Sequence, residues 1–187
     1  MMDRKTAATT DSGRRRLVTW LWRLPVIAAI GGLAFGLREA YRIQFGRARP
    51  NPDPAFVPHP PHAVAPLSDF AEPWSAVEFT YAGQPIIALR LPEAIPGGLS
   101  AEGIHLAAFS RICTHLGCPV LLKRDVEAIA FAFNFRGRHP ALVCPCHLSV
   151  FAPLEAGRAV SGPAIEPLPR VRLVLQAGVV YAAGVET

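Results

Sequence analysis

The chain beyond residue 49 has no excess of positive charge. Residues 50–187 contain nine Lys and Arg against eleven Asp and Glu, net −2, whereas residues 1–49 contain ten against three, net +7. The formal charge of +5 therefore comes from the N-terminal part of the chain. Because the larger part has no basic stripe, its composition gives no support to nucleic-acid binding.

The same region also has no long amphipathic helical pattern and no internal repeat. Short apolar or alternating runs separated by Gly and Pro turns favour antiparallel strands instead. The runs that predict strands are 76–81, 85–91, 104–110, 141–143, 171–175 and 179–182. Residues 67–187, about the size of one small domain, are therefore predicted to form an all-β domain. An inserted loop or hairpin is expected at 123–139, where the apolar run 128–133 is strand-like.

Cysteine is scarce, and its four residues are confined to two short motifs. Box 1 is Cys113-Thr114-His115-Leu116-Gly117-Cys118, and box 2 is Cys144-Pro145-Cys146-His147-Leu148-Ser149. A [2Fe-2S] cluster that takes one thiolate and one imidazole from each box would leave two cysteines to form a disulfide. This pattern is typical of an electron-transfer centre.

Both boxes resemble those of Rieske iron-sulfur proteins, whose pattern is Cys-x-His-x-Gly-Cys followed by Cys-x-x-His. The resemblance implies a Rieske-type domain of antiparallel sheets, with its cluster-binding loops within 108–164. It also implies one [2Fe-2S] cluster per chain, a disulfide and two pairs of metal ligands. The implied disulfide joins Cys118 and Cys146, and the implied ligands are Cys113 and Cys144 on one iron and His115 and His147 on the other.

Two other interpretations use part of the same residues. A structural zinc ion would accept two cysteines and two histidines, and two structural disulfides would use all four cysteines. A zinc site does not explain why each box has a second cysteine or why Gly117 precedes one of them. Two disulfides do not explain the histidines, which would be ordinary loop residues. Only the Rieske interpretation accounts for all six residues.

The ligand set indicates what such a cluster does. Two thiolates and two neutral imidazoles cancel the charge of two ferric ions and two sulfides, so an electron is added more easily than to an all-cysteine cluster. The unbound ring nitrogens of His115 and His147 can couple proton uptake to this electron. These histidines are therefore the predicted catalytic residues in the oxidation of a hydroquinone.

Other residues are expected to tune or cover the cluster. Ser149 stands where quinol-oxidising Rieske proteins often have a serine that donates to a sulfide, which raises the reduction potential. Phe151 stands where they often have a tyrosine, and its missing hydroxyl favours a lower potential and menaquinol as the donor. It is equally compatible with a plain core aromatic residue.

Gly162-Pro163 resembles the family's proline loop, which covers the cluster, although such a pair alone is only a turn signal. Leu116 is expected to shield the iron from water, or else to be a half-buried loop residue. Leu148 replaces a glycine that is usual at its position.

Residues 17–37 form an almost wholly apolar run of the length needed to cross a bilayer. We predict a transmembrane anchor helix at 17–45, in which Arg23 reaches the interface beside Trp20 and Trp22.

Residues 1–16 are then the cytoplasmic N-terminus. Arg14 and Arg15 resemble a twin-arginine export signal, and a plain positive-inside anchor predicts the same orientation. Because no small-x-small cleavage site follows the run, we expect an uncleaved single-pass anchor in the cytoplasmic membrane. The domain would lie on the periplasmic or extracytoplasmic side, where disulfides persist.

Between anchor and domain, residues 46–66 are predicted to form a proline-rich neck. Seven prolines between Pro50 and Pro66 exclude a helix or a central strand and favour an extended, semi-rigid tether. The neck either lets the domain swing between electron donor and acceptor or acts as a fixed spacer. His59 and His62 have no partner residues in the sequence and are predicted to be solvated.

These features predict the Rieske subunit of a cytochrome bc-type complex, one part of a quinol–cytochrome c oxidoreductase. A quinol in the cytochrome b partner would give an electron to the cluster, and a cytochrome c would receive it. One alternative is the small Rieske subunit of a periplasmic arsenite oxidase. Another is a membrane-anchored structural module held by zinc or disulfides, whereas a soluble dioxygenase ferredoxin should lack both the anchor and the spare cysteines.

Overall fold

The computed structural model describes residues 13 and 16–187. The chain divides into an N-terminal unit and a compact domain, Gly46–Thr187. Helix α2 (Arg23–Phe45) belongs to the first unit, and the stretch Arg16–Arg42 is long and apolar enough to cross a membrane. The predicted apolar helix is therefore present. Arg14 and Arg15 lie outside the described residues, so the export signal stays a prediction.

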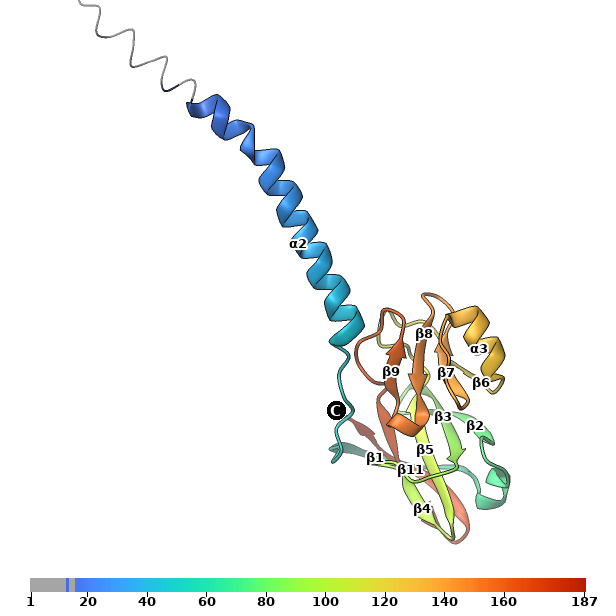
Figure 1. The fold of residues 1–187 in the computed structure, drawn as a ribbon. Coiled ribbons are helices and arrows are strands. Elements are labelled where there is room, and N and C mark those ends of the chain that lie inside the picture. Colours follow the sequence, from blue (N-terminus) through green and yellow to red (C-terminus); the bar gives the residue numbers. More distant parts are fainter. Residues whose placement is uncertain (1–12, 14–15) are drawn as a thin grey trace, which may run out of the picture. The chain divides into compact units, whose positions relative to one another are not determined.

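Two antiparallel sheets build the domain (Figure 1). Among the described residues, the large sheet has the order β1-β11-β10-β5-β3-β2, with β4 paired to β5, and the small sheet has the order β6-β7-β8-β9. The strands of the large sheet are β1 (Phe56–Pro66), β2 (Ala76–Tyr81), β3 (Gln84–Leu91), β4 (Leu99–Ala101), β5 (Ile104–Ser110), β10 (Arg170–Gln176) and β11 (Val179–Glu186). Those of the small sheet are β6 (Leu121–Lys123), β7 (Ala141–Cys144), β8 (Ser149–Ala152) and β9 (Arg158–Ser161).

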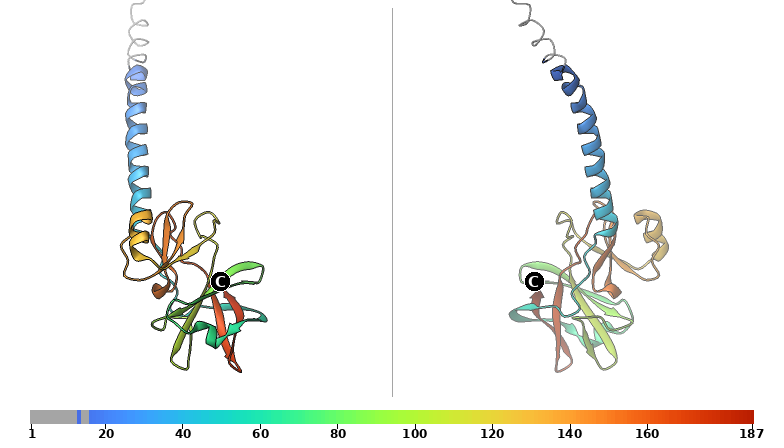
Figure 2. Two further views of the ribbon diagram at one scale, coloured as in Figure 1. Left: turned by 90° about the vertical axis from the view of Figure 1, so that its right-hand side faces the viewer. Right: turned by 60° about the vertical axis from the view of Figure 1, so that its left-hand side comes forward.

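The small sheet and the large sheet occupy opposite ends of the domain, as the two views of Figure 2 show. Short 3-10 turns follow β1 and β8, at Leu67–Phe70 and Pro153–Glu155. All six predicted strands are present, and the predicted fold is confirmed. The strands that the sequence did not indicate are either three or four residues long or, in β1, rich in proline.

The prediction of a strand-like run at 128–133 is wrong, because these residues belong to helix α3 (Val126–Phe133). The Asp125 side chain caps the helix by accepting hydrogen bonds from the backbone N–H groups of Glu127 and Ala128, at 2.9 and 3.1 Å. Ile129 and Phe133, one helical turn apart, are buried against the small sheet. The N-cap and the four-residue spacing of the buried Ile129 and Phe133 therefore favour a helix, although the composition of the run is typical of a strand.

The central strands are buried on both faces, so their residues alternate between two cores. Ile87 of β3 and Phe109 of β5 pack with Phe151 of β8, which joins the two sheets. Their neighbours Ile86 and Ala108 belong to the core on the other side of the large sheet. The loops that leave the ends of these strands therefore start from rigid positions.

The prediction of a tether over the whole of 46–66 is wrong for its second half, since β1 pairs with β11 as an edge strand. An edge position tolerates proline, and the register shifts between Pro58 and His62, where Pro60 and Pro61 lie. His59 and His62 are exposed, as predicted. They do have neighbours, because the His62 ring stacks on Phe79 with centroids 6.0 Å apart.

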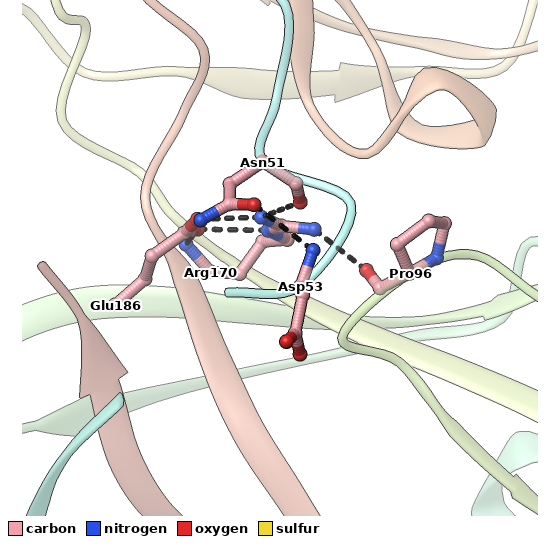
Figure 3. A network of polar contacts seen from close by, with 5 residues as sticks. All are labelled: Asn51, Asp53, Pro96, Arg170 and Glu186. Atoms are coloured by element: carbon pink, nitrogen blue, oxygen red, sulfur yellow. Dashed lines mark hydrogen bonds and ion pairs between the residues drawn. The ribbon is translucent and has the colours of Figure 1, made fainter. Parts of the chain in front are cut away.

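Arg170 also bonds the residues that precede β1 to the rest of the domain (Figure 3). Its side chain is buried, and it donates to both carboxylate oxygens of Glu186, at 2.7 and 2.5 Å. It also donates to the carbonyl oxygens of Pro96 and Asn51, at 2.7 and 2.8 Å. The Asn51 side chain accepts the backbone N–H of Asp53 at 2.9 Å. A buried guanidinium thus fixes residues 51–53 against strands β10 and β11.

Candidate metal centre

Three loops contribute to the candidate site. Box 1 connects β5 to β6, box 2 forms the turn between β7 and β8, and a third segment follows β9. Box 1 and the third segment are joined by the Thr114 hydroxyl, which donates to the carbonyl oxygen of Glu166 at 2.8 Å. Thr114 was not among the predicted site residues, because its partner lies 52 positions away and leaves no local signal.

Backbone hydrogen bonds close box 1 into a tight turn. The N–H of Cys113 donates to the carbonyl of Cys118 at 2.8 Å, and the N–H of Gly117 donates back to Cys113 at 2.9 Å. Gly117 has φ +78°, a left-handed conformation that glycine adopts without steric cost. The backbone conformation of the turn therefore favours glycine at this position of the motif.

Box 2 forms a short turn at the end of β7. Cys144 and Ser149 are register partners, so four residues connect the two strands. The last of these, Leu148, has φ +60°, where a side chain costs roughly 1 kcal/mol relative to glycine. This explains why a glycine would be usual there.

A disulfide joins Cys118 and Cys146, the pair that the family resemblance implied. It connects the two boxes covalently. The sulfur of Cys144 lies within 4.8 Å of both disulfide sulfurs. Sulfur atoms in a disulfide have no thiolate to bind a metal, so these three cysteines do not form a metal site by themselves. Their proximity shows that the Cys118–Cys146 disulfide lies beside the free Cys144.

Cys113 and Cys144 are the free cysteines, and both are buried. Burial raises the pKa of the Cys113 thiol, and the neighbouring Cys144 sulfur raises it further, whereas backbone N–H groups of His115 and Leu116 lower it. The thiols are therefore adjacent, and N–H donors point at one of them. Metal binding would displace the thiol proton and leave these donors facing a charged sulfur.

The imidazole rings of His115 and His147 lie next to each other. Their ring centroids are 4.9 Å apart and the rings are nearly perpendicular, at 86°. Nδ1 of His115 is buried and has no hydrogen-bond partner among the described residues. An unpaired buried nitrogen is costly, and a bond to a metal would satisfy it. With two free thiols and two adjacent imidazoles, the residues fit a [2Fe-2S] cluster.

The predicted tuning and covering residues lie around this set. Ser149 is fully buried, and its hydroxyl oxygen accepts the N–H of Ala164 at 3.2 Å. Phe151 is buried in the core between the sheets. Leu116 and Leu148 are 69% and 47% exposed, so they form apolar tips at the surface of the two boxes.

The third segment presses against box 2 through Gly162. This residue has φ +77°, and a Cβ atom there would lie 2.6 Å from the carbonyl oxygen of Leu148 and from Cα of Ser149. Only glycine permits this approach. Gly162 therefore places this segment directly beside box 2, and its role as a cover for the cluster stays a prediction.

Comparison with known proteins identifies the family. The sequence model of the Rieske [2Fe-2S] domain family matches residues 61–172 of this chain. The chain belongs to this family. It is similar to the cytochrome bc1 complex Rieske iron-sulfur subunit of Streptomyces lividans, with 36% identity over 91 residues that cover 47% of this chain and 46% of the relative.

Other members of the Rieske family are similar to a comparable degree. The iodate reductase subunit IdrB of Denitromonas iodatirespirans is 30% identical over 113 residues, which cover 59% of this chain and 55% of the relative. The soluble domain of Rieske protein II from Sulfolobus acidocaldarius has a TM-score of 0.53 and 27% identity, over 67% of this chain and 78% of that one. The chain spans about half the length of these two curated relatives.

Proposed function

We propose that this chain is the Rieske subunit of a cytochrome bc-type complex, which takes an electron from a quinol and passes it to a cytochrome c. The observation that carries the cluster is the set of two buried free thiols and two adjacent imidazoles, one of which has an unpaired buried Nδ1. Similarity to named bc1 subunits favours the quinol complex. Cys113 and Cys144 would hold one iron, and His115 and His147 the other. When bound, the cluster supplies a one-electron acceptor.

The protein's own residues would prepare the site for a quinol. His147 is exposed, so its ring nitrogen that does not bind metal is available to a quinol hydroxyl. The exposed tips of Leu116 and Leu148 would pack against an apolar partner surface around it. Phe151 has no hydroxyl to offer to a ligand sulfur, which supports a lower potential and menaquinol as the donor.

The N-terminal helix supports a membrane anchor, and the Cys118–Cys146 disulfide supports an extracytoplasmic position for the domain. The cytochrome b partner and the cytochrome c acceptor belong to the same proposal. Similarity to named bc1 subunits supports them.

A second candidate is the Rieske subunit of a complex that acts on an inorganic oxyanion. The match to the iodate reductase subunit extends over more residues than the match to the bc1 subunit, 113 against 91. The arsenite oxidase alternative belongs to the same class. Both candidates use the same cluster, so the metal site does not separate them.

Purification of the full chain in mild detergent from its native membrane tests the proposal. We expect b-type haem to copurify, together with a Rieske-type electron paramagnetic resonance signal whose midpoint potential falls as the pH is raised. Copurification with a molybdenum protein and no haem would replace the first candidate with the second. Zinc without iron or acid-labile sulfide would exclude both.

A further inference from the structure

Residues 47–53, here called the strap, are bonded to the domain at both ends. Arg47 Nη2 donates to the carbonyl oxygen of Gly162 at 3.0 Å, and the N–H of Ala48 donates to Ile165 at 2.8 Å. At the other end, Arg170 donates to Asn51. Gly46 separates Phe45, the last residue of α2, from Arg47.

The partners of Arg47 and Ala48 belong to the proline loop, here residues 162–166. This loop bonds inward to the two boxes, through the N–H of Ala164 and the carbonyl of Glu166. It bonds outward to the strap, through the carbonyls of Gly162 and Ile165. The loop is therefore held between the candidate cluster site on one side and the strap on the other.

Arg47 also places a positive charge at the loop. Its side chain is partly buried, and burial together with the neighbouring Arg158 lowers the pKa of its guanidinium. Arg158 in turn pairs with Glu155 at 2.9 Å. A cationic group near a cluster favours the reduced, more negative state, because Coulomb attraction is stronger in a partly dehydrated site.

We propose that Arg47 is a positioning residue for the cluster: with Ala48 it holds the proline loop over the site, and its charge raises the reduction potential. The inference rests on the proposed [2Fe-2S] site. It also assigns a role to the first part of the predicted neck. Release of the strap would loosen the cover of the cluster.

Variants of the full-length chain separate the hydrogen bonds from the charge. Arg47→Ala removes both, Arg47→Gln keeps a donor without charge, and Arg47→Lys keeps the charge. Ala48→Pro removes the other N–H without a change of charge. Arg49→Ala is the matched control, because Arg49 is exposed and its loss changes the net charge equally.

The readouts are the rate at which the cluster is lost to a chelator and the midpoint potential from paramagnetic resonance. Arg47→Ala and Ala48→Pro should lose the cluster about fivefold faster than Arg49→Ala, the effect of one hydrogen bond. Arg47→Gln should lose the cluster as slowly as the wild type but keep the lowered midpoint potential of Arg47→Ala. Arg47→Lys should have the midpoint potential of the wild type. Circular dichroism and a test for the intact disulfide check that each variant folds. If Ala48→Pro does not fold, the rate of cluster loss in Arg47→Ala alone tests the proposal.

Loss of the cluster at the control rate in both Arg47→Ala and Ala48→Pro, with a normal wild-type signal, would overturn this inference alone. A wild-type chain that holds no iron-sulfur cluster would overturn the proposed function and this inference together.

Discussion

The hydroxyl oxygen of Ser149 accepts a hydrogen bond from the backbone N–H of Ala164, so its own proton is left to donate elsewhere. The side chain is fully buried beside the free Cys144 of box 2. A buried hydroxyl proton needs an acceptor, and a cluster sulfide would provide one. This contact is one of those that hold the proline loop, and it leaves the Ser149 proton free to donate to a cluster.

Ser149→Ala should lower the midpoint potential, because the reduced cluster loses a donor. The expected decrease is roughly 60 mV, equivalent to about 1.4 kcal/mol for one electron. A titration followed by paramagnetic resonance measures it, with Ser100→Ala on strand β4 as a remote control. An unchanged potential would show that the Ser149 proton does not donate to the cluster.

The disulfide should stabilise the two boxes together. It closes a segment with a sequence separation of 28, and removal of such a cross-link costs about 3 kcal/mol. We therefore expect Cys118→Ser to speed cluster loss while all four proposed ligands remain, as measured by absorbance decay under chelator. Equal decay in wild type and variant would remove the case for this role.

The core strands could be predicted from sequence because their signal is local. β2 and β5 have the predicted bounds, since alternation and turn residues lie within the strands and their neighbours. Helix α3 was missed because its apolar run also fits a strand, although Asp125 and the spacing of Ile129 and Phe133 were available as signals. Strand β1 was missed because proline hides an edge strand.

In the candidate site, too, local motifs could be predicted from the sequence and contacts between distant residues could not. The two boxes are contiguous motifs, so their cysteines and histidines could be named from sequence. Arg47 and Gly162 are 115 positions apart, and no pattern in either segment indicates that they meet. Contacts of this kind depend on how the sheets place the loops, which only the structure shows.

Helix α3 provides a pair of phenylalanines that test its assignment. Phe131 is 94% exposed and Phe133 is 7% exposed. Phe131→Ala should change the free energy of unfolding by less than about 0.5 kcal/mol, whereas Phe133→Ala should lower it by about 3 kcal/mol. Urea denaturation of both variants measures the difference. The opposite order would contradict the helical register.

The ion pair between Arg170 and Glu186 should be sensitive to loss of one partner. Arg170→Met would leave the largely buried Glu186 carboxylate without its cation and should lower the free energy of unfolding by about 3–4 kcal/mol. Replacement of both residues by Met should recover part of this loss. Arg172→Met is the matched control, because Arg172 lies on the same strand and is exposed. A single variant as stable as the control would mean that the network contributes little.

Tyr81 should make the domain sensitive to alkaline pH. Burial raises the pKa of its hydroxyl above the ordinary value of 10.0, and the hydroxyl donates to the carbonyl of His59 at 3.2 Å. The folded state therefore holds this proton more tightly than the unfolded state does. The resulting stability is complete below pH 10 and is lost as the pH rises through the folded-state pKa. Tyr81→Phe should be less stable by about 1 kcal/mol at pH 7, and the difference should shrink above pH 10. Urea denaturation from pH 7 to 11 measures both profiles, and parallel profiles would show that ionisation of Tyr81 is not linked to unfolding.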